Sequence, residues 1–190
     1  MTKNILLTGV GGQGTILTTK ILSTGLSRLG YDVKMSEIHG MSQRGGTVNT
    51  QLKYGKKVYA PNIGPGEADL IVAFEKAEAL RALPYLKQGG EILMDEKEIF
   101  PLSVLTGKAA YPHEAPKALT ASGARITVLP AGAIAESLGS PKSQNICLLG
   151  ALVKCLGLED FDWEGLISQM VPQKTVEGNL AAFRAGLERV

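Results

Sequence analysis

Short apolar runs, glycine-rich turns and segments with helical spacing alternate along the chain. Ile5-Leu6-Leu7 is a continuous apolar run, which is typical of a strand buried on both faces. Residues 14–29 follow with apolar positions at helical spacing, and Gly30 closes this segment. Residues 32–38 predict a second strand. The order strand, glycine turn, helix, strand is a βαβ unit, whose crossover is right-handed.

The remaining sequence continues this alternation. Polar and apolar residues alternate over 48–54, and Gly55-Lys56-Lys57 followed by Val58-Tyr59 predicts the turn and return strand of a β-hairpin. Further strands are expected at 69–74, 91–94 and 125–129, and further helices at 76–83, 131–138, 143–156 and 176–187. Residues 96–122 have weak periodicity and receive only a loose assignment. The pattern predicts a single α/β domain over residues 1–190, with three layers, a Rossmann-like opening and a mostly parallel sheet covered by helices on both faces.

Composition narrows the function classes. The 190 residues suffice for one domain with a substantial core, and the net charge of +2 gives no indication of general nucleic-acid binding. Cys147 and Cys155 are the only cysteines, too few for an iron–sulfur cluster, and no zinc-ligand spacing is present. No apolar run reaches the length of a signal-peptide core or a membrane span. We therefore expect a cytoplasmic protein without a metal site of its own.

The first candidate site is Gly9-Val10-Gly11-Gly12-Gln13-Gly14, which fits the pattern G-x-G-x-x-G between a predicted strand and a predicted helix. Glycines allow a tight turn close to a ligand, and the following helix N-terminus favours an anion. Glu37 lies near the position of a ribose-binding acid, so a dinucleotide is one interpretation. Packing of a glycine-rich turn against a partner chain is the other.

The second candidate site is the polar segment from Ser36 to Gly46 at the carboxyl end of the second predicted strand. That edge of an open α/β sheet is where ligands bind. Arg44 could hold a carboxylate or phosphate with two hydrogen bonds, and His39 could transfer protons near neutral pH. The alternative is a polar loop whose side chains bind their own backbone and a neighbouring subunit.

These two segments together resemble the gamma component of the 2-oxoacid:ferredoxin oxidoreductases. The resemblance joins Gly-x-Gly-Gly-Gln-Gly at 9–14 with Glu-x-His-Gly-Met-Ser-Gln-Arg-Gly-Gly at 37–46, and the second form resembles the beta subunit of indolepyruvate ferredoxin oxidoreductase. It continues through residues 66–73, 145–151 and 177–186 and so covers nearly the whole chain. The paired motifs are specific together, whereas neither is specific alone.

The resemblance implies an enzyme subunit that is inactive alone. Thiamine diphosphate, Mg²⁺ and iron–sulfur clusters are expected on a larger partner subunit, with coenzyme A as cosubstrate and ferredoxin as the electron acceptor. The catalytic candidates are Glu37, His39 and Arg44. The candidates for cofactor contact are Gly9, Gly11, Gly12, Gln13, Gly14, Ser42, Gln43, Gly45 and Gly46. The substrate is expected to be indolepyruvate or another arylpyruvate. A complex for pyruvate, 2-ketoisovalerate or 2-oxoglutarate, and a nucleotide-binding regulatory module, are the alternatives.

Overall fold

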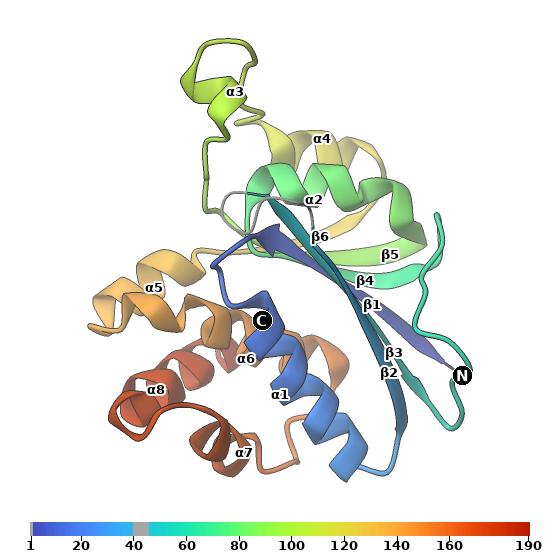
Figure 1. The fold of residues 1–190 in the computed structure, drawn as a ribbon, viewed down its shortest axis with the longest axis vertical. Helices are drawn as coiled ribbons and strands as arrows, with labels where there is room; N and C mark the ends of the chain where they lie inside the picture. The colour runs from blue at the N-terminus through green and yellow to red at the C-terminus, as the bar shows by residue number, and fades with distance from the viewer. Residues whose placement is uncertain (1, 40–45) are drawn as a thin grey trace.

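The computed structural model describes residues 2–39 and 46–190 and contains a six-stranded sheet (Figure 1). The strands are β1 (Lys3–Val10), β2 (Asp32–His39), β3 (Thr47–Gly55), β4 (Ala68–Ala73), β5 (Leu86–Asp95) and β6 (Arg125–Leu129). Their order across the sheet is β2-β3-β1-β4-β5-β6. Strands β1, β4, β5 and β6 are parallel, while β3 lies antiparallel between β1 and β2. The predicted mostly parallel sheet is confirmed.

Helices cover both faces of this sheet. The helices are α1 (Thr15–Arg28), α2 (Lys76–Ala82), α3 (Leu102–Leu105), α4 (Ala115–Ala121), α5 (Ala131–Ser137), α6 (Gln144–Leu156), α7 (Trp163–Met170) and α8 (Val176–Leu187), with short 3-10 helices η1 (Leu83–Tyr85), η2 (Pro141–Ser143) and η3 (Gln173–Thr175). Helices α1 and α5 to α8 lie on one face and α2 and α4 on the other, so the predicted three layers are confirmed (Figure 1). In the described ranges, no helix is long and apolar enough to cross a membrane.

Two apolar clusters explain why the central strands are apolar throughout. Ile5 and Leu7 of β1 point into the larger cluster, which also contains apolar residues of α1, α6, α7 and α8. Leu6 points to the opposite face and packs with Ile71 and residues of α2 and α4. Since successive side chains of a strand alternate between faces, a strand covered on both sides needs apolar residues at consecutive positions.

The predicted hairpin between residues 48–54 and 58–59 is wrong. β3 continues to Gly55, and residues 58–59 are not in a strand. Instead, the Val58 amide donates to Asp32 Oδ2 at 2.8 Å, which holds the segment after β3 against the start of β2. The alternation in the sequence identified a strand correctly, but the neighbours of that strand are β1 and β2 rather than the residues that follow it.

Helix α1 connects two strands that point the same way but do not touch. Both β1 and β2 pair antiparallel with β3, so both end at the same edge of the sheet. Val10 lies opposite Thr47, and His39 lies opposite Val48. The βαβ prediction is therefore correct in strand direction, with β3 inserted between its two strands. This arrangement brings the ends of both candidate segments to one edge.

Candidate functional site

The glycine loop after β1 has a backbone shape that requires glycine at two positions. Gly12 has φ of 98° and Gly14 has φ of 78°, both in the left-handed region that other residues rarely adopt. Gly14 is also packed closely, because a Cβ there would lie 2.6 Å from Asn145 Nδ2. At Gly12, by contrast, a Cβ would meet no described atom within 4 Å. The loop is thus pressed against α6 on one side and open at Gly12.

Gln13 holds this loop in place with both polar atoms of its side chain. Its Oε1 accepts from the Val10 amide at 2.7 Å, and its Nε2 donates to the Phe74 carbonyl at 2.6 Å. These two bonds tie the loop to the ends of β1 and β4. The two hydrogen bonds give Gln13 a structural role in stabilising the loop. The predicted contact of Gln13 with a cofactor stays a prediction.

The second candidate segment ends beside the glycine loop. The Gly11 amide donates to the Gly46 carbonyl at 3.0 Å, so the two segments touch where the structure describes both. Glu37 is half-buried on β2, in register with Thr50 of β3. His39 is the last residue of β2, and its backbone alone is described. Ser42, Gln43, Arg44 and Gly45 lie outside the described residues.

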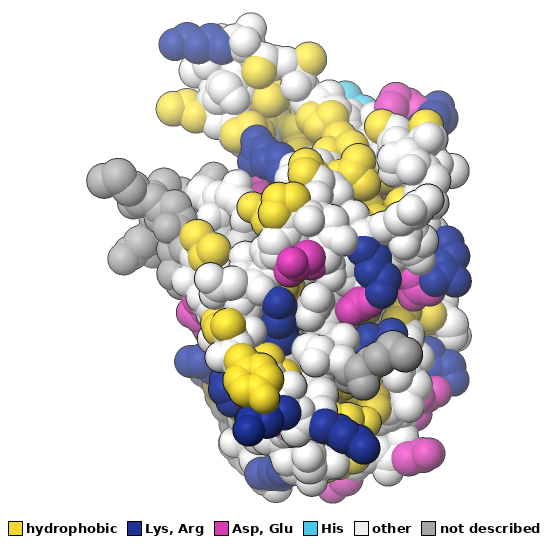
Figure 2. Space-filling model, turned by 90° about the vertical axis from the view of Figure 1, so that its right-hand side faces the viewer, with side chains coloured by type: hydrophobic (Ala, Val, Ile, Leu, Met, Phe, Trp, Pro, Cys, Tyr) yellow, Lys and Arg dark blue, Asp and Glu magenta, His cyan; other side chains and the backbone are white. Residues whose placement is uncertain are grey.

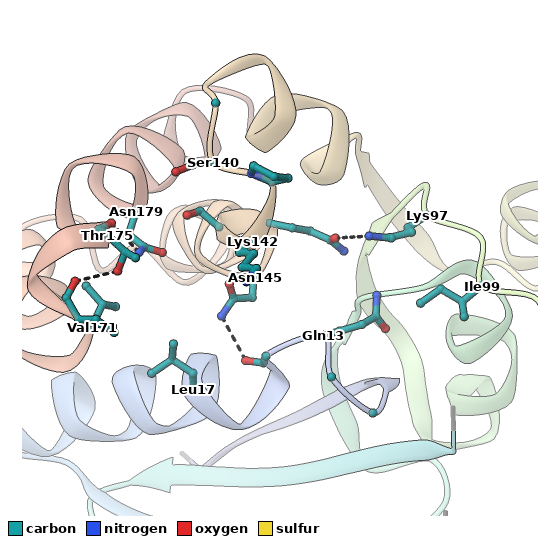
Figure 3. Close-up of a pocket in the computed structure, with 18 residues that line it drawn as sticks. Gln13, Leu17, Lys97, Ile99, Ser140, Lys142, Asn145, Val171, Thr175 and Asn179 are labelled. Atoms are coloured by element: carbon teal, nitrogen blue, oxygen red, sulfur yellow. Dashed lines mark hydrogen bonds between the residues drawn. The ribbon is translucent and has the colours of Figure 1, made fainter. Parts of the chain in front are cut away.

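A cleft of about 950 Å³ opens over the glycine loop (Figure 3). Its walls come from the segments after β1 and β5, the turn between α5 and α6, and the start of α8. The described residues that line it are Gly11, Gly12, Gln13, Gly14, Leu17, Lys97, Ile99, Gly139, Ser140, Pro141, Lys142, Ser143, Gln144, Asn145, Val171, Pro172, Thr175 and Asn179. This lining contains two lysines and no Asp or Glu among the described residues. An anion is therefore favoured over a cation.

The wall opposite the glycine loop consists of residues that the sequence pattern did not identify. Lys97 Nζ donates to Gln144 Oε1 at 2.9 Å (Figure 3), and this bond fixes which way the Gln144 amide points. Gln144 is only 6% exposed, and its Nε2 has no hydrogen-bond partner in the described part of the chain. A buried amide donor without a partner is costly, so a ligand acceptor at this place would be stabilised.

Asn145 joins the two walls of the cleft. Its Nδ2 donates to the Gly14 carbonyl at 3.3 Å (Figure 3), and its backbone carbonyl accepts from the Thr18 hydroxyl at 3.3 Å. These contacts give Asn145 a role in packing α6 against the glycine loop. The sequence did carry a signal for this wall, since Gly139 to Ser143 is a polar turn directly before the most apolar helix of the chain.

The chemistry that these groups can support is the binding of a polar, anionic ligand. The N-terminus of α1 favours negative charge, as do Lys97 and Lys142. Across residues 2–39 and 46–190, no group of three His, Cys, Asp or Glu side chains converges as a metal site would require. Cys147 is buried, and burial raises the pKa of its thiol to about 12, so it is a core residue rather than a nucleophile.

Comparison with known proteins gives matches over nearly the whole chain. A family model described as pyruvate ferredoxin/flavodoxin oxidoreductase matches residues 4–189. The indolepyruvate oxidoreductase subunit IorB of Thermococcus kodakarensis is 37% identical over 190 residues, covering 97% of this chain and 94% of that relative. The 2-oxoglutarate synthase subunit KorC of Methanothermobacter thermautotrophicus is 26% identical, and the match covers 99% of this chain and 95% of that relative. The structure of a keto/oxoacid ferredoxin oxidoreductase gamma subunit from Geobacter sulfurreducens superposes with a TM-score of 0.72 at 26% identity. The superposition covers 98% of this chain and 97% of that subunit.

Proposed function

The chain belongs to the pyruvate ferredoxin/flavodoxin oxidoreductase family, and we propose that it is the small subunit of a 2-oxoacid:ferredoxin oxidoreductase that acts on indolepyruvate or a related arylpyruvate. The observation that carries this proposal is the 37% identity to an indolepyruvate oxidoreductase subunit over 97% of the chain. Residues 1–190 act in it as one gamma-type domain. The overall reaction converts a 2-oxoacid and coenzyme A to acyl-coenzyme A and CO₂, with two electrons passed to ferredoxin.

A larger partner subunit supplies the cofactors in this proposal. Thiamine diphosphate with Mg²⁺ bound there would supply the decarboxylation chemistry, and iron–sulfur clusters would supply the path for the electrons. The cysteine content of this chain supports that division, because a cluster usually takes four thiolates and the chain has two cysteines. One of them, Cys147, is buried in the core with a raised pKa. In this proposal the chain works inside a complex in the cytoplasm.

The small subunit contributes the cleft and the two glycine-rich segments. Lys97, Lys142 and the N-terminus of α1 attract an anionic group, and the phosphates of coenzyme A or the carboxylate of the substrate have that charge. Glu37, His39 and Arg44 come from the neighbouring segment and face the active site of the partner in this proposal. Their roles are proton transfer for the acid and the imidazole, and anion binding for the guanidinium.

We expect the isolated chain to reduce no viologen dye with indolepyruvate, thiamine diphosphate, Mg²⁺ and coenzyme A, and we expect turnover once the larger subunit is added. Turnover by the pure chain would refute the division of labour. A substrate panel in the same assay distinguishes indolepyruvate from 2-oxoglutarate, which the similarity to a 2-oxoglutarate synthase subunit makes the second candidate. Tight binding of NAD or NADP, without catalysis in the complex, would instead indicate a regulatory module.

Arg44 provides the sharpest test of the second segment. Arg44→Ala should lower turnover of the reconstituted complex by about 10- to 100-fold, because a hydrogen-bonded contact between charged groups contributes about 1.5–3 kcal/mol. Arg44→Lys should recover part of the activity, since lysine keeps the charge but lacks the planar fork. The proposal assigns Arg44 to the surface of the subunit, and surface substitutions usually change stability by less than about 0.5 kcal/mol, so the melting temperature should stay nearly unchanged.

A matched control for Arg44 is Arg28→Ala in the last turn of α1, at the end of that helix away from the glycine loop. It removes the same charge and should leave turnover unchanged. If Arg44→Ala leaves turnover unchanged in the assembled complex, the segment is structural. If Arg44→Ala unfolds the subunit, the arginine is a buried element of the fold and its functional role is wrong.

A further inference from the structure

A narrow projection, residues 99–111, stands off the body of the molecule between β5 and α4. Its tip carries the short helix α3, which lies well away from the sheet and the other helices (Figure 1). In the space-filling view, hydrophobic side chains gather on the projection and on the surface below it (Figure 2). Neither the cleft nor the fold core uses α3, so the projection needs an explanation of its own.

Both ends of the projection are fixed to one buried carboxylate. Glu75 is 1% exposed and is the N-cap of α2, where its Oε2 accepts from the Glu78 amide at 3.0 Å. Its Oε1 accepts from the Ile99 amide at 3.1 Å and from the Tyr111 hydroxyl. Three donors, from Glu78, Ile99 and Tyr111, thus converge on one buried side chain. Both ends of the projection are therefore held against the start of α2.

A second set of contacts supports the same base. Glu98 lies 2.9 Å from Lys76 Nζ and 3.0 Å from His113 Nδ1. The ring of Tyr111 packs against Phe100 with centroids 5.0 Å apart. These contacts hold residues just before and just after the projection to the start of α2. The apolar side chains at the tip are thus presented in a defined position rather than on a free loop.

The projection exposes large apolar side chains to solvent. Leu102 is 74% exposed and Leu105 is 68% exposed, and their i, i+3 spacing on α3 puts them on one side. Phe100 adds a ring that is 43% exposed. Contiguous exposed apolar groups of this kind mark interaction sites. Lys108 is the one charged side chain of the projection, residues 99–111, so a complementary surface is apolar and is acidic opposite Lys108.

The projection also adjoins the cleft. Ile99 lines the cleft and is held by Glu75, and the exposed apolar residues begin at the next position. Whatever covers Phe100, Leu102 and Leu105 is therefore adjacent to the rim of the cleft. A second copy of this chain fits less well as the occupant. The described lining of its large cleft carries Lys97 and Lys142, whose positive charges would repel Lys108 of a projection inserted there.

We propose that this projection is the docking element for the larger subunit of the oxidoreductase, inserting Leu102 and Leu105 into an apolar groove that is acidic opposite Lys108. The inference rests on the proposed function, which supplies that partner. Docking through a feature attached to the cleft rim places the larger subunit against the cleft. It also gives Glu75 a positioning role, since Glu75 fixes both ends of the projection.

The test is the affinity between the purified chain and the larger subunit of its complex, measured by titration calorimetry. Leu102→Ser and Leu105→Ser are each expected to weaken binding by about 30-fold, the size usual for a central interface residue. Tyr59→Ser is the matched control, because Tyr59 is 85% exposed and lies outside the projection. The melting temperature of all three variants should match that of the wild-type chain, since none of the side chains is buried.

The outcomes separate the docking proposal from the proposed function. Unchanged affinity in the Leu102→Ser/Leu105→Ser double variant overturns docking through the projection, whatever the turnover of the complex. Weakened binding of that variant supports docking, and turnover of the wild-type complex then tests the function separately. If light scattering shows a dimer of the wild-type chain that the double variant converts to a monomer, the occupant is a second copy and the proposal is wrong.

Discussion

Replacing Gly150 with alanine is expected to lower the free energy of unfolding by about 3 kcal/mol, the upper end of the usual cost of overpacking. Gly150 lies in α6, where that helix crosses α8. A Cβ on Gly150 would lie 2.1 Å from the Phe183 carbonyl oxygen and 3.0 Å from the Leu187 amide nitrogen. These are backbone atoms of a helix, so they cannot rotate away as a side chain could. The helices must separate, which opens the packing of the larger apolar cluster.

The same crossing contains a second glycine that faces the other way. A Cβ on Gly186 of α8 would lie 2.0 Å from the Cys147 carbonyl oxygen of α6. Gly186→Ala should therefore destabilise the chain by a similar amount. The double variant should cost less than the sum of the two, because one separation of the helices relieves both clashes.

Urea unfolding followed by circular dichroism measures both effects. Gly132→Ala is the control, because Gly132 is also helical and a Cβ there would come no closer than 3.8 Å to its nearest neighbour, Gln144 Oε1. Alanine is favoured over glycine in helices by up to about 1 kcal/mol, so this control should be neutral or stabilising. A Gly150→Ala midpoint equal to that of the wild-type chain would show that α6 and α8 do not cross this closely.

The helix crossing also determines one wall of the cleft. Gln144 and Asn145 are the first residues of α6, and Asn179 on α8 lines the same cleft. A shift of α6 away from α8 would move the Gln144 amide relative to the glycine loop. The distance between α6 and α8, which the two glycines allow to be short, thus also affects the position of the cleft residues in the first turn of α6.

Much of the fold could be predicted because its signals are local. The continuous apolar run of β1 and the glycines at positive φ around residues 12 and 14 are properties of neighbouring residues. Strand neighbours are different, because pairing depends on segments far apart in the sequence. The alternation over β3 showed a strand, and nothing near it showed that β3 fits between β1 and β2.

The candidate site likewise has one part that local sequence patterns predict and one part that depends on residues far apart in the sequence. The glycine loop and the polar segment after β2 were identified from their own residues, and their contact through Gly11 and Gly46 follows from strand direction. The opposite wall was missed because it forms only when α6 packs against the loop. Asn145 reaches Gly14 across 131 positions of sequence, a separation that no local pattern describes.

Asp95 is expected to make the stability of the chain fall as the pH rises from about 4 to about 6. It ends β5 beside Lys97 and Gln144 and is 2% exposed. Burial raises the pKa of its carboxyl to about 6, although nearby backbone amides at Gly132, Lys97 and Ala131 and the charge of Lys97 partly oppose this. Its Oδ2 has no regular hydrogen-bond partner within the described residues, so the charged form is poorly compensated.

The sign of the effect follows from the two pKa values of Asp95. Below pH 4 the carboxyl is protonated in both states, since an unfolded aspartate has a pKa of about 3.9. Between pH 4 and pH 6 the unfolded chain loses this proton and the folded chain keeps it, so each increase in pH within this range favours unfolding. A difference of about two pKa units corresponds to about 3 kcal/mol, which is fully lost once the pH exceeds the folded-state value.

Asp95→Asn isolates this contribution from the other carboxylates, several of which have lowered pKa values through ion pairs and act in the opposite direction. The asparagine cannot ionise, so the unfolding free energy of the variant relative to the wild-type chain should rise by about 3 kcal/mol between pH 4 and pH 8. Urea midpoints of both proteins at five pH values measure this difference. Any constant cost of the new amide shifts the difference equally at every pH and does not affect its slope. Parallel curves for the two proteins would mean that Asp95 ionises as easily in the folded chain as in the unfolded one, and that its surroundings at the end of β5 are wetter than the buried geometry indicates.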